Sequence, residues 1–335
     1  MDTKTMQNRQ VILSRYPDGH PRAEDFEVVS IDMPGPGTEE VLCRTRYLSL
    51  DPYMRSQIAG RHISGSIAPG DAMRGESVAE VVESSHAAFT PGQLVRGFGG
   101  WCEYFTLPGS ALSPVNPGLD RPSLELSLLG MTGLTAWAGM IWQAEVKAGD
   151  RVLIPAVTGG VGSAAAQFCR LRGAEVIGTA GSEKKCAYAV DALGALACIN
   201  RHEGDLAGQL DQHFPGGIDV YFDLVGGELL HLASERLALQ SRVVLAGLMA
   251  EYNDAERAPG PPPGFWIRAR ATIHGLVVYD FEPRRREFVD TCLPLLREGK
   301  LDQREDMTDG IESAPEAFCR LMHGGNFGKV VVAFP

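Results

Sequence analysis

Strands and helices alternate regularly between residues 150 and 245, and this alternation restricts the possible fold more than any other feature of the chain. The start of the segment shows the pattern: "RVLIPAV" is an apolar strand, "GSAAAQFCRLRG" is a helix that ends at Gly173, and "AEVIGTA" is a second strand. Each strand is a short, continuous apolar run, as expected where helices cover both faces of a sheet. The sequence therefore predicts an α/β domain built on a doubly wound parallel sheet.

The part of the chain before this segment predicts a different kind of domain. Short β-forming runs are separated by turns that contain Pro and Gly, and this spacing is typical of a compact, barrel-like β domain. A helix is predicted to begin at Ser123, which would be its N-cap, and to continue to residue 143. The final strand, "GKVVVAF", is expected to return to the first domain. We therefore assign residues 1–125 and 301–335 to the β domain and residues 126–300 to the parallel-sheet domain.

The charge and the apolar runs of the chain restrict its partners and its compartment. The formal net charge of -11 argues against binding to nucleic acid or to an anionic membrane, because both need a basic face. The sequence shows neither a signal peptide nor an apolar run that would span a bilayer comfortably, so we expect a cytoplasmic protein. The seven cysteines are scattered and odd in number, which indicates reduced thiols.

The turn between the first strand and the helix, "AVTGGVG", resembles the dinucleotide fingerprint G-x-G-x-x-G, with Val157 at the first glycine position. Gly159 and Gly160 would let the backbone approach a pyrophosphate, and Gly162 would let the helix pack closely on the strand. Amides at the helix N-terminus, from about Val161 onward, would face the phosphates. A structural turn without a ligand is the alternative interpretation.

The end of the second strand indicates which dinucleotide this turn would bind. NAD sites usually have an acidic residue there to hold the ribose hydroxyls, but this chain has "TAGSEKK". Ser182 and Lys185, together with Arg201 after the third strand, would bind a 2'-phosphate by charge-assisted hydrogen bonds. The segment therefore predicts NADPH, although Lys184 and Lys185 could also be ordinary solvated helix residues.

The chain as a whole resembles the zinc-free branch of the medium-chain dehydrogenase/reductase superfamily, which includes prostaglandin reductases and alkenal double-bond reductases. The resemblance implies a GroES-like β-barrel catalytic domain, a Rossmann domain and a homodimer. It also implies hydride transfer from NADPH to the β-carbon of a small α,β-unsaturated ketone or aldehyde. No metal is expected, since "YLSLDPYM" offers no Cys or His as a zinc ligand. The matching segments are "YLSLDPYMR", "GMTGLTAW", "AVTGGVGSAAAQ", "AGSEKK", "YFDLVGG", "AGLMAEYN", "GLVVYDF" and "GGNFGKVVV".

The resemblance also implies roles for individual residues. Tyr252 would donate a proton or stabilise the enolate, and Tyr53 would line the substrate end of the cleft. Asn326 would contact the cofactor, and Met131 and Thr132 would lie beside the nicotinamide. The structural alternatives are aromatic packing for Tyr252, a core position for Tyr53, left-handed backbone geometry for Asn326 and helix packing for the other two.

Four residues depart from the pattern of this branch: Val157, Glu76, Arg201 and Arg268. Glu76 and Arg268 leave the substrate open, because a smaller or uncharged residue is expected at position 76 and an apolar or aromatic residue at position 268, near the substrate entrance. The leading hypothesis is an NADPH-dependent reductase of activated C=C bonds. The alternatives are an NADPH-dependent quinone reductase and an NADPH-binding protein without catalytic activity.

Overall fold

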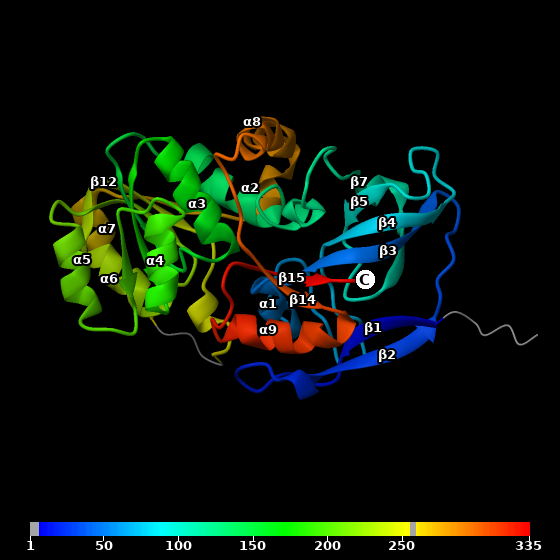
Figure 1. Ribbon diagram of the computed structural model, residues 1–335. Helices are drawn as coiled ribbons and strands as arrows, with labels where there is room; N and C mark the ends of the chain where they lie inside the picture. The colour runs from blue at the N-terminus through cyan, green and yellow to red at the C-terminus, as the bar shows by residue number, and fades with distance from the viewer. Residues whose placement is uncertain (1–6, 255–258) are drawn as a thin grey trace, which may run out of the picture. The chain divides into compact units, whose positions relative to one another are not determined.

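The computed structural model describes residues 7–254 and 259–335. The chain forms two compact units. One unit runs to Ser127 and takes up the chain again from Glu305 to Pro335, and the other consists of Leu128–Arg304. Figure 1 shows the elements of each unit, which we describe separately.

A six-stranded parallel sheet forms the centre of the unit Leu128–Arg304, in the order β10-β9-β8-β11-β12-β13. The order reverses beside β8, because the chain adds β9 and β10 on one side and β11 to β13 on the other. In sheets of this kind, ligands bind outside the carboxyl ends of the strands at such a reversal. The strands are β8 (Arg151–Ile154), β9 (Glu175–Ala180), β10 (Ala197–Asn200), β11 (Ile218–Asp223), β12 (Leu237–Leu245) and β13 (Thr272–Gly275).

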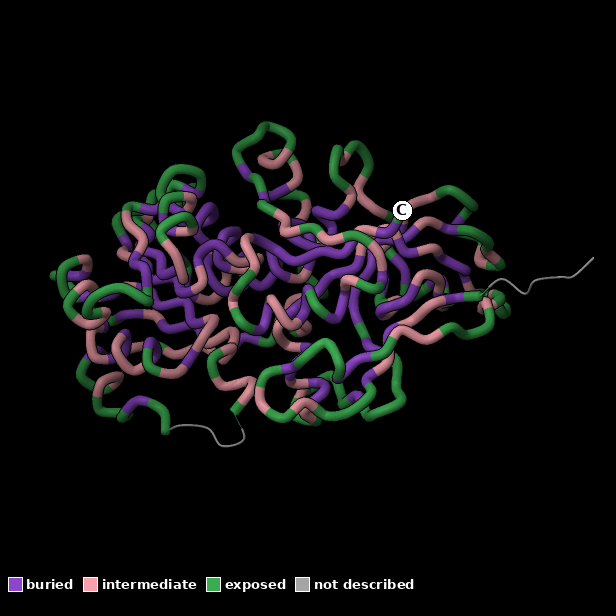
Figure 2. The backbone as a smooth tube through the Cα atoms, turned by 60° about the horizontal axis from the view of Figure 1, so that its bottom comes forward, coloured by how far each residue is buried: buried purple, intermediate pink, exposed green. Residues whose placement is uncertain are grey.

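Helices cover this sheet and close its core. One apolar cluster joins Leu153, Tyr221 and Val243 of the sheet to residues of α5, α6 and α7. A second cluster joins aromatic rings of α2, α3 and α8: the ring centroids of Trp137 and Phe168 are 5.1 Å apart. Figure 2 shows the buried backbone running through the interior of each unit. The helices are α2 (Met131–Trp137), α3 (Gly160–Leu171), α4 (Glu183–Asp191), α5 (Leu206–His213), α6 (Gly227–Glu235), α7 (Gly264–Ala269) and α8 (Arg285–Arg297).

The helix predicted from Ser123 is wrong in its start and in its continuity. A 3-10 turn at Pro122–Leu126 comes first, α2 begins only at Met131, and a π-helical turn at Ala138–Gln143 follows it. The Ser123 hydroxyl does not cap a helix but donates to Glu305 Oε2 at 2.8 Å. The break lies between Ser127, whose Oγ donates to Glu305 Oε1 at 2.8 Å, and Gly130, which is extended and forms the N-cap of α2.

An antiparallel sheet forms most of the other unit, as the sequence predicts. Its strand order is β14-β15-β3-β4-β5-β7, with β6 paired to β3, and a separate hairpin-like pair joins β1 to β2. The final strand β15 pairs with β3 as expected, and it also lies parallel to β14. The pairing of the strands in the described residues follows this open order, so a closed barrel is not shown. The strands are β1 (Gln7–Leu13), β2 (Phe26–Asp32), β3 (Glu40–Ser49), β4 (Ser77–Ser84), β5 (Leu94–Gly97), β6 (Tyr104–Pro108), β7 (Ser113–Pro114), β14 (Glu305–Asp309) and β15 (Lys329–Ala333).

Two helices complete this unit, α1 (Tyr53–Ile58) and α9 (Ala314–Met322). The start of α1 is fixed by a buried ion pair, in which Lys329 Nζ lies 3.0 Å from Asp51 Oδ1. Lys329 also donates to the carbonyl oxygen of Leu50 at 2.6 Å. Strand β15, near the end of the sequence, therefore anchors the start of α1, which lies far earlier in the sequence. Over residues 7–254 and 259–335, no helix is both long enough and apolar enough to cross a membrane.

Candidate active site

The turn between β8 and α3 explains why a valine is tolerated at the first glycine position. Ala156 takes the left-handed conformation, with φ of 48°, so the tight bend falls one residue earlier. The side chain of Val157 is fully buried. A Cβ placed on Gly178 of β9 would lie 2.5 Å from Val157 Cγ1, so the valine fills the space that Gly178 leaves. Val157 is thus a packing residue of the sheet.

The other glycines of this turn leave room for a ligand at the N-terminus of α3. A Cβ on Gly162 would lie 2.4 Å from the carbonyl oxygen of Ala156, so only glycine lets the helix come this close to the strand. Gly159 is the extended N-cap residue, and it has no side chain to bond the first amides. The amides of Gly160, Val161 and Gly162 have no acceptor within the helix because they belong to its first turn. This terminus fits a pyrophosphate.

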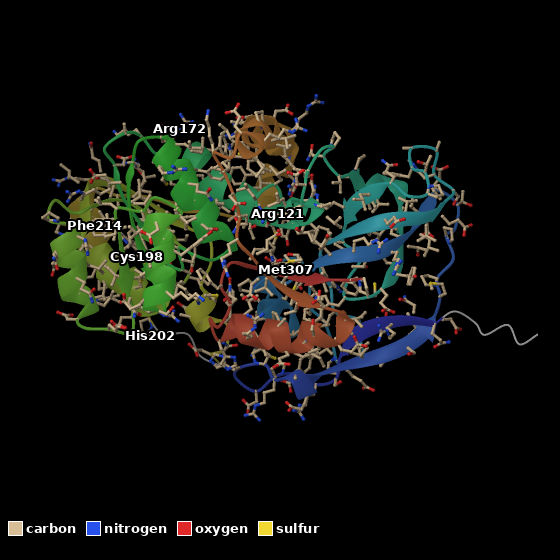
Figure 3. The ribbon with its side chains drawn as sticks, in the orientation of Figure 1. Arg121, Arg172, Cys198, His202, Phe214 and Met307 are labelled. Carbon is tan, nitrogen blue, oxygen red and sulfur yellow. The ribbon has the colours of Figure 1, made fainter. Side chains whose placement is uncertain are left out.

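Basic groups come together at the carboxyl ends of β9 and β10. The amide of Arg201 donates to the carbonyl oxygen of Ala180 at 2.9 Å, which ties the turn after β10 to the end of β9. A Cβ on Gly181 would lie 3.7 Å from Arg201 Nε and 3.6 Å from His202 Nε2. Figure 3 labels His202 in this turn, beyond Cys198 of β10. A phosphate beside Gly181 would therefore meet a guanidinium and an imidazole.

The next residues belong to the start of α4. Ser182 is the N-cap, as predicted, and its Oγ accepts from the amide of Lys185 at 3.4 Å. Lys185 is half-buried, whereas Lys184 is exposed. The structure thus brings Ser182 and Arg201 to the two sides of Gly181, and it gives Lys185 the more enclosed position of the two lysines.

Tyr252 follows a short 3-10 turn after β12. Its hydroxyl oxygen accepts a hydrogen bond from the amide of Leu248 at 3.4 Å. The turn is tied to the end of β11, because the amide of Ala250 donates to the carbonyl oxygen of Val225 at 2.9 Å. Tyr252 therefore lies near the carboxyl ends of β11 and β12, at the same edge of the sheet as the glycine turn.

Asp223 is a buried carboxylate at the end of β11 that sequence reasoning did not single out. Its Oδ1 accepts from the Tyr221 hydroxyl at 3.0 Å and from the amides of Val225 and Gly226 at 2.9 and 2.8 Å. Its Oδ2 is buried and has no hydrogen-bond partner. Burial raises the pKa of this carboxyl group, and Glu251 adds a smaller effect in the same direction. The signal in the sequence was an acidic residue at the end of an apolar strand, directly before "LVGG".

Met131 and Thr132 begin α2, which lies against α3. Thr132 is buried and Met131 is half-buried. The helix comes close to the preceding chain, since a Cβ on Gly133 would lie 1.8 Å from the carbonyl oxygen of Leu128. Glycine is therefore required at this position, and the packing places both residues in the same unit as the glycine turn.

Tyr53 and Asn326 belong to the antiparallel-sheet unit. Tyr53 is the first residue of α1 and is half-buried, so it is not a fully enclosed core residue. Asn326 does not have the left-handed backbone that its Gly-rich turn suggested; Gly324 and Gly328 have it instead. The Asn326 side chain closes the turn by donating from Nδ2 to the carbonyl oxygen of Gly328 at 2.8 Å.

Two of the residues that depart from the expected pattern have structural partners. Glu76 is buried, and its Oε1 lies 2.5 Å from Arg96 Nη1. Arg96 Nε lies 3.7 Å from Glu125 Oε2, so one guanidinium serves two buried carboxylates. Arg268 donates to the carbonyl oxygen of Glu235 near the end of α6 and lies over the ring of Phe265. Both residues are thus accounted for by contacts within their own units.

We next consider whether the cysteines could act as nucleophiles and whether any side chains could bind a metal ion. All seven cysteines are unbridged. Burial raises the pKa of Cys43 and of Cys292 to about 12, which makes these thiols poor nucleophiles. In the part of the chain that the structure describes, no three His, Cys, Asp or Glu side chains gather as ligands for a metal ion.

Comparison with known protein families matches both units. The family described as the N-terminal domain of oxidoreductase matches residues 9–115, and the family described as zinc-binding dehydrogenase matches residues 160–296. The NADPH-dependent curcumin reductase of Escherichia coli (strain K12) is 36% identical over 99% of this chain and 98% of its own length. The NADP(+)-dependent 2-alkenal reductase of Nicotiana tabacum is 36% identical over 97% of each chain. Prostaglandin reductase 1 of Bos taurus is 35% identical over 96% of this chain and 97% of its own.

Solved structures with the same fold were also found. The crystal structure of CurA from Vibrio vulnificus in complex with NADPH has a TM-score of 0.93 and 36% sequence identity, and the match covers 98% of this chain and 99% of that one. A quinone oxidoreductase of Pseudomonas syringae pv. Tomato DC3000 has a TM-score of 0.79 at 22% identity, over 98% of this chain and 100% of that one. The second likeness concerns the fold alone.

Proposed function

Because the chain belongs to the NADPH-dependent enone and alkenal reductases of the medium-chain dehydrogenase/reductase superfamily, we propose that it reduces the C=C bond of α,β-unsaturated ketones and aldehydes with NADPH. One observation supports the preference for NADPH over NADH. At Gly181, directly after β9, the structure has Arg201 nearby, and β9 does not end in an acidic residue. The ribose hydroxyls of NADH are usually bound by an acidic side chain at this position, whereas the 2'-phosphate of NADPH is bound by a basic one.

The unit Leu128–Arg304 would hold the cofactor through its own amides and basic groups. The first-turn amides of α3, from Gly160 to Gly162, would bind the pyrophosphate. Ser182, Lys185 and Arg201 would bind the 2'-phosphate. Bound there, NADPH supplies the hydride for the reduction. Met131, Thr132 and Asn326 are proposed as further contacts to the cofactor.

Tyr252 would stabilise the charge that the reaction creates. When the β-carbon of an enone gains a hydride, negative charge develops on the carbonyl oxygen. The Tyr252 O–H would donate to that oxygen, and the Leu248 amide, which donates to the phenol oxygen at 3.4 Å, would help to orient it. Hydrogen bonds directed at developing charge are a large source of catalysis. Protonation of the α-carbon, by Tyr252 or by water, completes the reduction, and Tyr53 is proposed to line the substrate end.

A substrate panel tests this function. Simple enones, 2-alkenals and quinones are each offered with NADPH and with NADH, and loss of the reduced-nicotinamide absorbance is followed. We expect turnover of enones and alkenals with NADPH and much weaker turnover with NADH. Turnover confined to quinones would favour the quinone reductase, and binding of NADPH without turnover of any substrate would favour a non-catalytic protein.

The unbridged cysteines and the family membership support two proposals about the molecule in the cell, the first its compartment and the second its assembly. We propose that it is cytoplasmic and that it forms a homodimer. Light scattering coupled to size-exclusion chromatography measures the mass directly, and a monomeric mass at micromolar concentration would contradict the dimer.

A further inference from the structure

The turn that follows α1 is bound to the helix by its backbone. The amide of Arg61 donates to the carbonyl oxygen of Ser56 at 2.9 Å, and the amide of Ile67 donates to the carbonyl oxygen of Gln57 at 3.1 Å. The turn therefore leaves the helix and returns to it within a few residues. A side chain carried between these two bonds is held in a defined position relative to α1.

His62 is such a side chain, and its ring is oriented by hydrogen bonds. Its Nδ1 accepts from the amide of Ser64 at 3.1 Å and lies 2.7 Å from Ser64 Oγ. Ser64 Oγ in turn accepts from Gln57 Nε2 at 2.9 Å, so its own hydrogen is directed to Nδ1. Gln57 is buried on α1, one turn after Tyr53. Because Nδ1 is an acceptor in both contacts, the proton of the neutral imidazole is on Nε2.

The imidazole lies against the ring of Tyr53. The two ring centroids are 4.9 Å apart, with an angle of 33° between the ring planes. Both residues are half-buried, so each presents part of its surface to the outside of the unit. Burial lowers the pKa of His62 from its ordinary value, which favours the neutral form near pH 7. His62 Nε2–H is therefore a neutral hydrogen-bond donor beside the ring of Tyr53.

We infer that His62 is a specificity-determining residue, which donates from Nε2–H to a second oxygen of the substrate, beyond the enone carbonyl. This inference rests on the proposed function and on the proposed place of Tyr53 at the substrate end. An enone that carries an ether, hydroxyl or carbonyl oxygen in its substituent would satisfy the donor. A purely hydrocarbon substituent would leave it without a partner, and an unpaired polar group in a binding site disfavours such a ligand.

The test compares enones that differ in one atom. Steady-state kcat/KM is measured for an aliphatic enone and for a series in which an ether oxygen replaces one methylene at successive positions. We expect the wild-type protein to prefer at least one ether enone. His62→Phe keeps a ring against Tyr53 but has no donor, so it should lower kcat/KM for that substrate by about tenfold or more. For the parent enone, kcat/KM should not fall and should rise where the unpaired donor had disfavoured binding, because phenylalanine removes that donor.

Two further variants make the result specific. His62→Gln keeps an N–H donor and should recover much of the preference. His86→Phe is the matched control, because His86 also accepts an amide at Nδ1, from Ala88 at 3.2 Å, and lies beside Phe89 at 5.5 Å. This control should leave both substrates unchanged.

Each other outcome has a distinct meaning. Equal loss on both substrates in His62→Phe, no loss on either, or a wild-type protein without any preference in the series would overturn the role of His62 while leaving the enone reductase intact. A wild-type protein that turns over no enone at all would overturn the proposed function itself, and the inference with it.

Discussion

At the scale of single residues, the two lysines at the start of α4 have different surroundings. Lys184 is exposed, whereas Lys185 is half-buried in the first turn, beside the Ser182 cap. A phosphate near Gly181 would be held by groups that are already restrained. The sequence alone left both lysines open as solvated helix residues, because it does not show which way each of two neighbouring side chains points.

Lys185→Ala tests this assignment. Loss of one charged hydrogen bond, worth roughly 1.5–3 kcal/mol, should weaken NADPH binding by about ten- to a hundredfold. The dissociation constants of NADPH and NADH are measured by fluorescence titration, with Lys184→Ala as the matched control. NADH binding should barely change, since it has no 2'-phosphate. Equal weakening of the two cofactors would contradict the role of Lys185.

At the scale of elements, α3 can approach the end of β8 only because Gly162 has no Cβ atom. A Cβ on Gly162 would meet backbone, the carbonyl oxygen of Ala156 at 2.4 Å and the Cα of Val157 at 2.8 Å. Backbone atoms cannot turn aside as a flexible side chain can. The spacing of glycines in the sequence predicted this close packing, but it did not predict that Ala156 would make the bend or that Val157 would fill the space over Gly178.

Gly162→Ala should therefore destabilise the protein by about 2 kcal/mol, the usual cost of overpacking a tight site. The free energy of unfolding is measured by urea denaturation. Gly216→Ala is the control, because a Cβ on Gly216 would have no neighbour within 4 Å. The control should change stability by less than about 0.5 kcal/mol. Similar effects of both substitutions would show that the approach of α3 does not depend on Gly162.

The sequence predicted the helices and strands of some regions better than those of others. The strand and helix pattern of residues 151–245 was predicted well because each element has a continuous apolar run or an amphipathic face and ends at a Gly or a cap. The prediction for residues 123–143 was wrong because their apolar pattern fits one long helix, whereas the backbone leaves the helical conformation at Ser127 and Gly130 and begins α2 only at Met131. Asp223 was missed because two of its three hydrogen bonds come from amides of the turn after β11, and the shape of that turn was not predicted.

At the scale of the whole molecule, the groups proposed to bind the phosphates of the cofactor come from separate parts of the chain that meet at one edge of the parallel sheet. Hydrogen exchange followed by mass spectrometry should show this grouping. NADPH should slow exchange in peptides that cover residues 156–163, 180–186 and 200–204, because bound phosphates shield these amides and restrain their turns. Peptides of β1 and β2 should be unaffected.

NADH provides the discriminating comparison in the same experiment. At matched saturation it should protect residues 156–163 but leave residues 200–204 close to the unliganded rate, since NADH has no 2'-phosphate for the turn that carries Arg201 and His202. Equal protection of residues 200–204 by both cofactors would remove this turn from the selection of NADPH.

The pairing of β15 with β3 has a consequence for the order in which the protein can form during synthesis. The unit Leu128–Arg304 is one continuous stretch of chain, so all of its strands have been translated while the other unit still lacks two. The antiparallel sheet receives β15 between β14 and β3 only after Lys329–Ala333 has been made. Lys329 brings with it the partner of Asp51 at the start of α1. Until then, the parallel sheet can be complete while the chain is still on the ribosome, but Asp51, which precedes the helix that carries Tyr53, lacks the positive charge of Lys329.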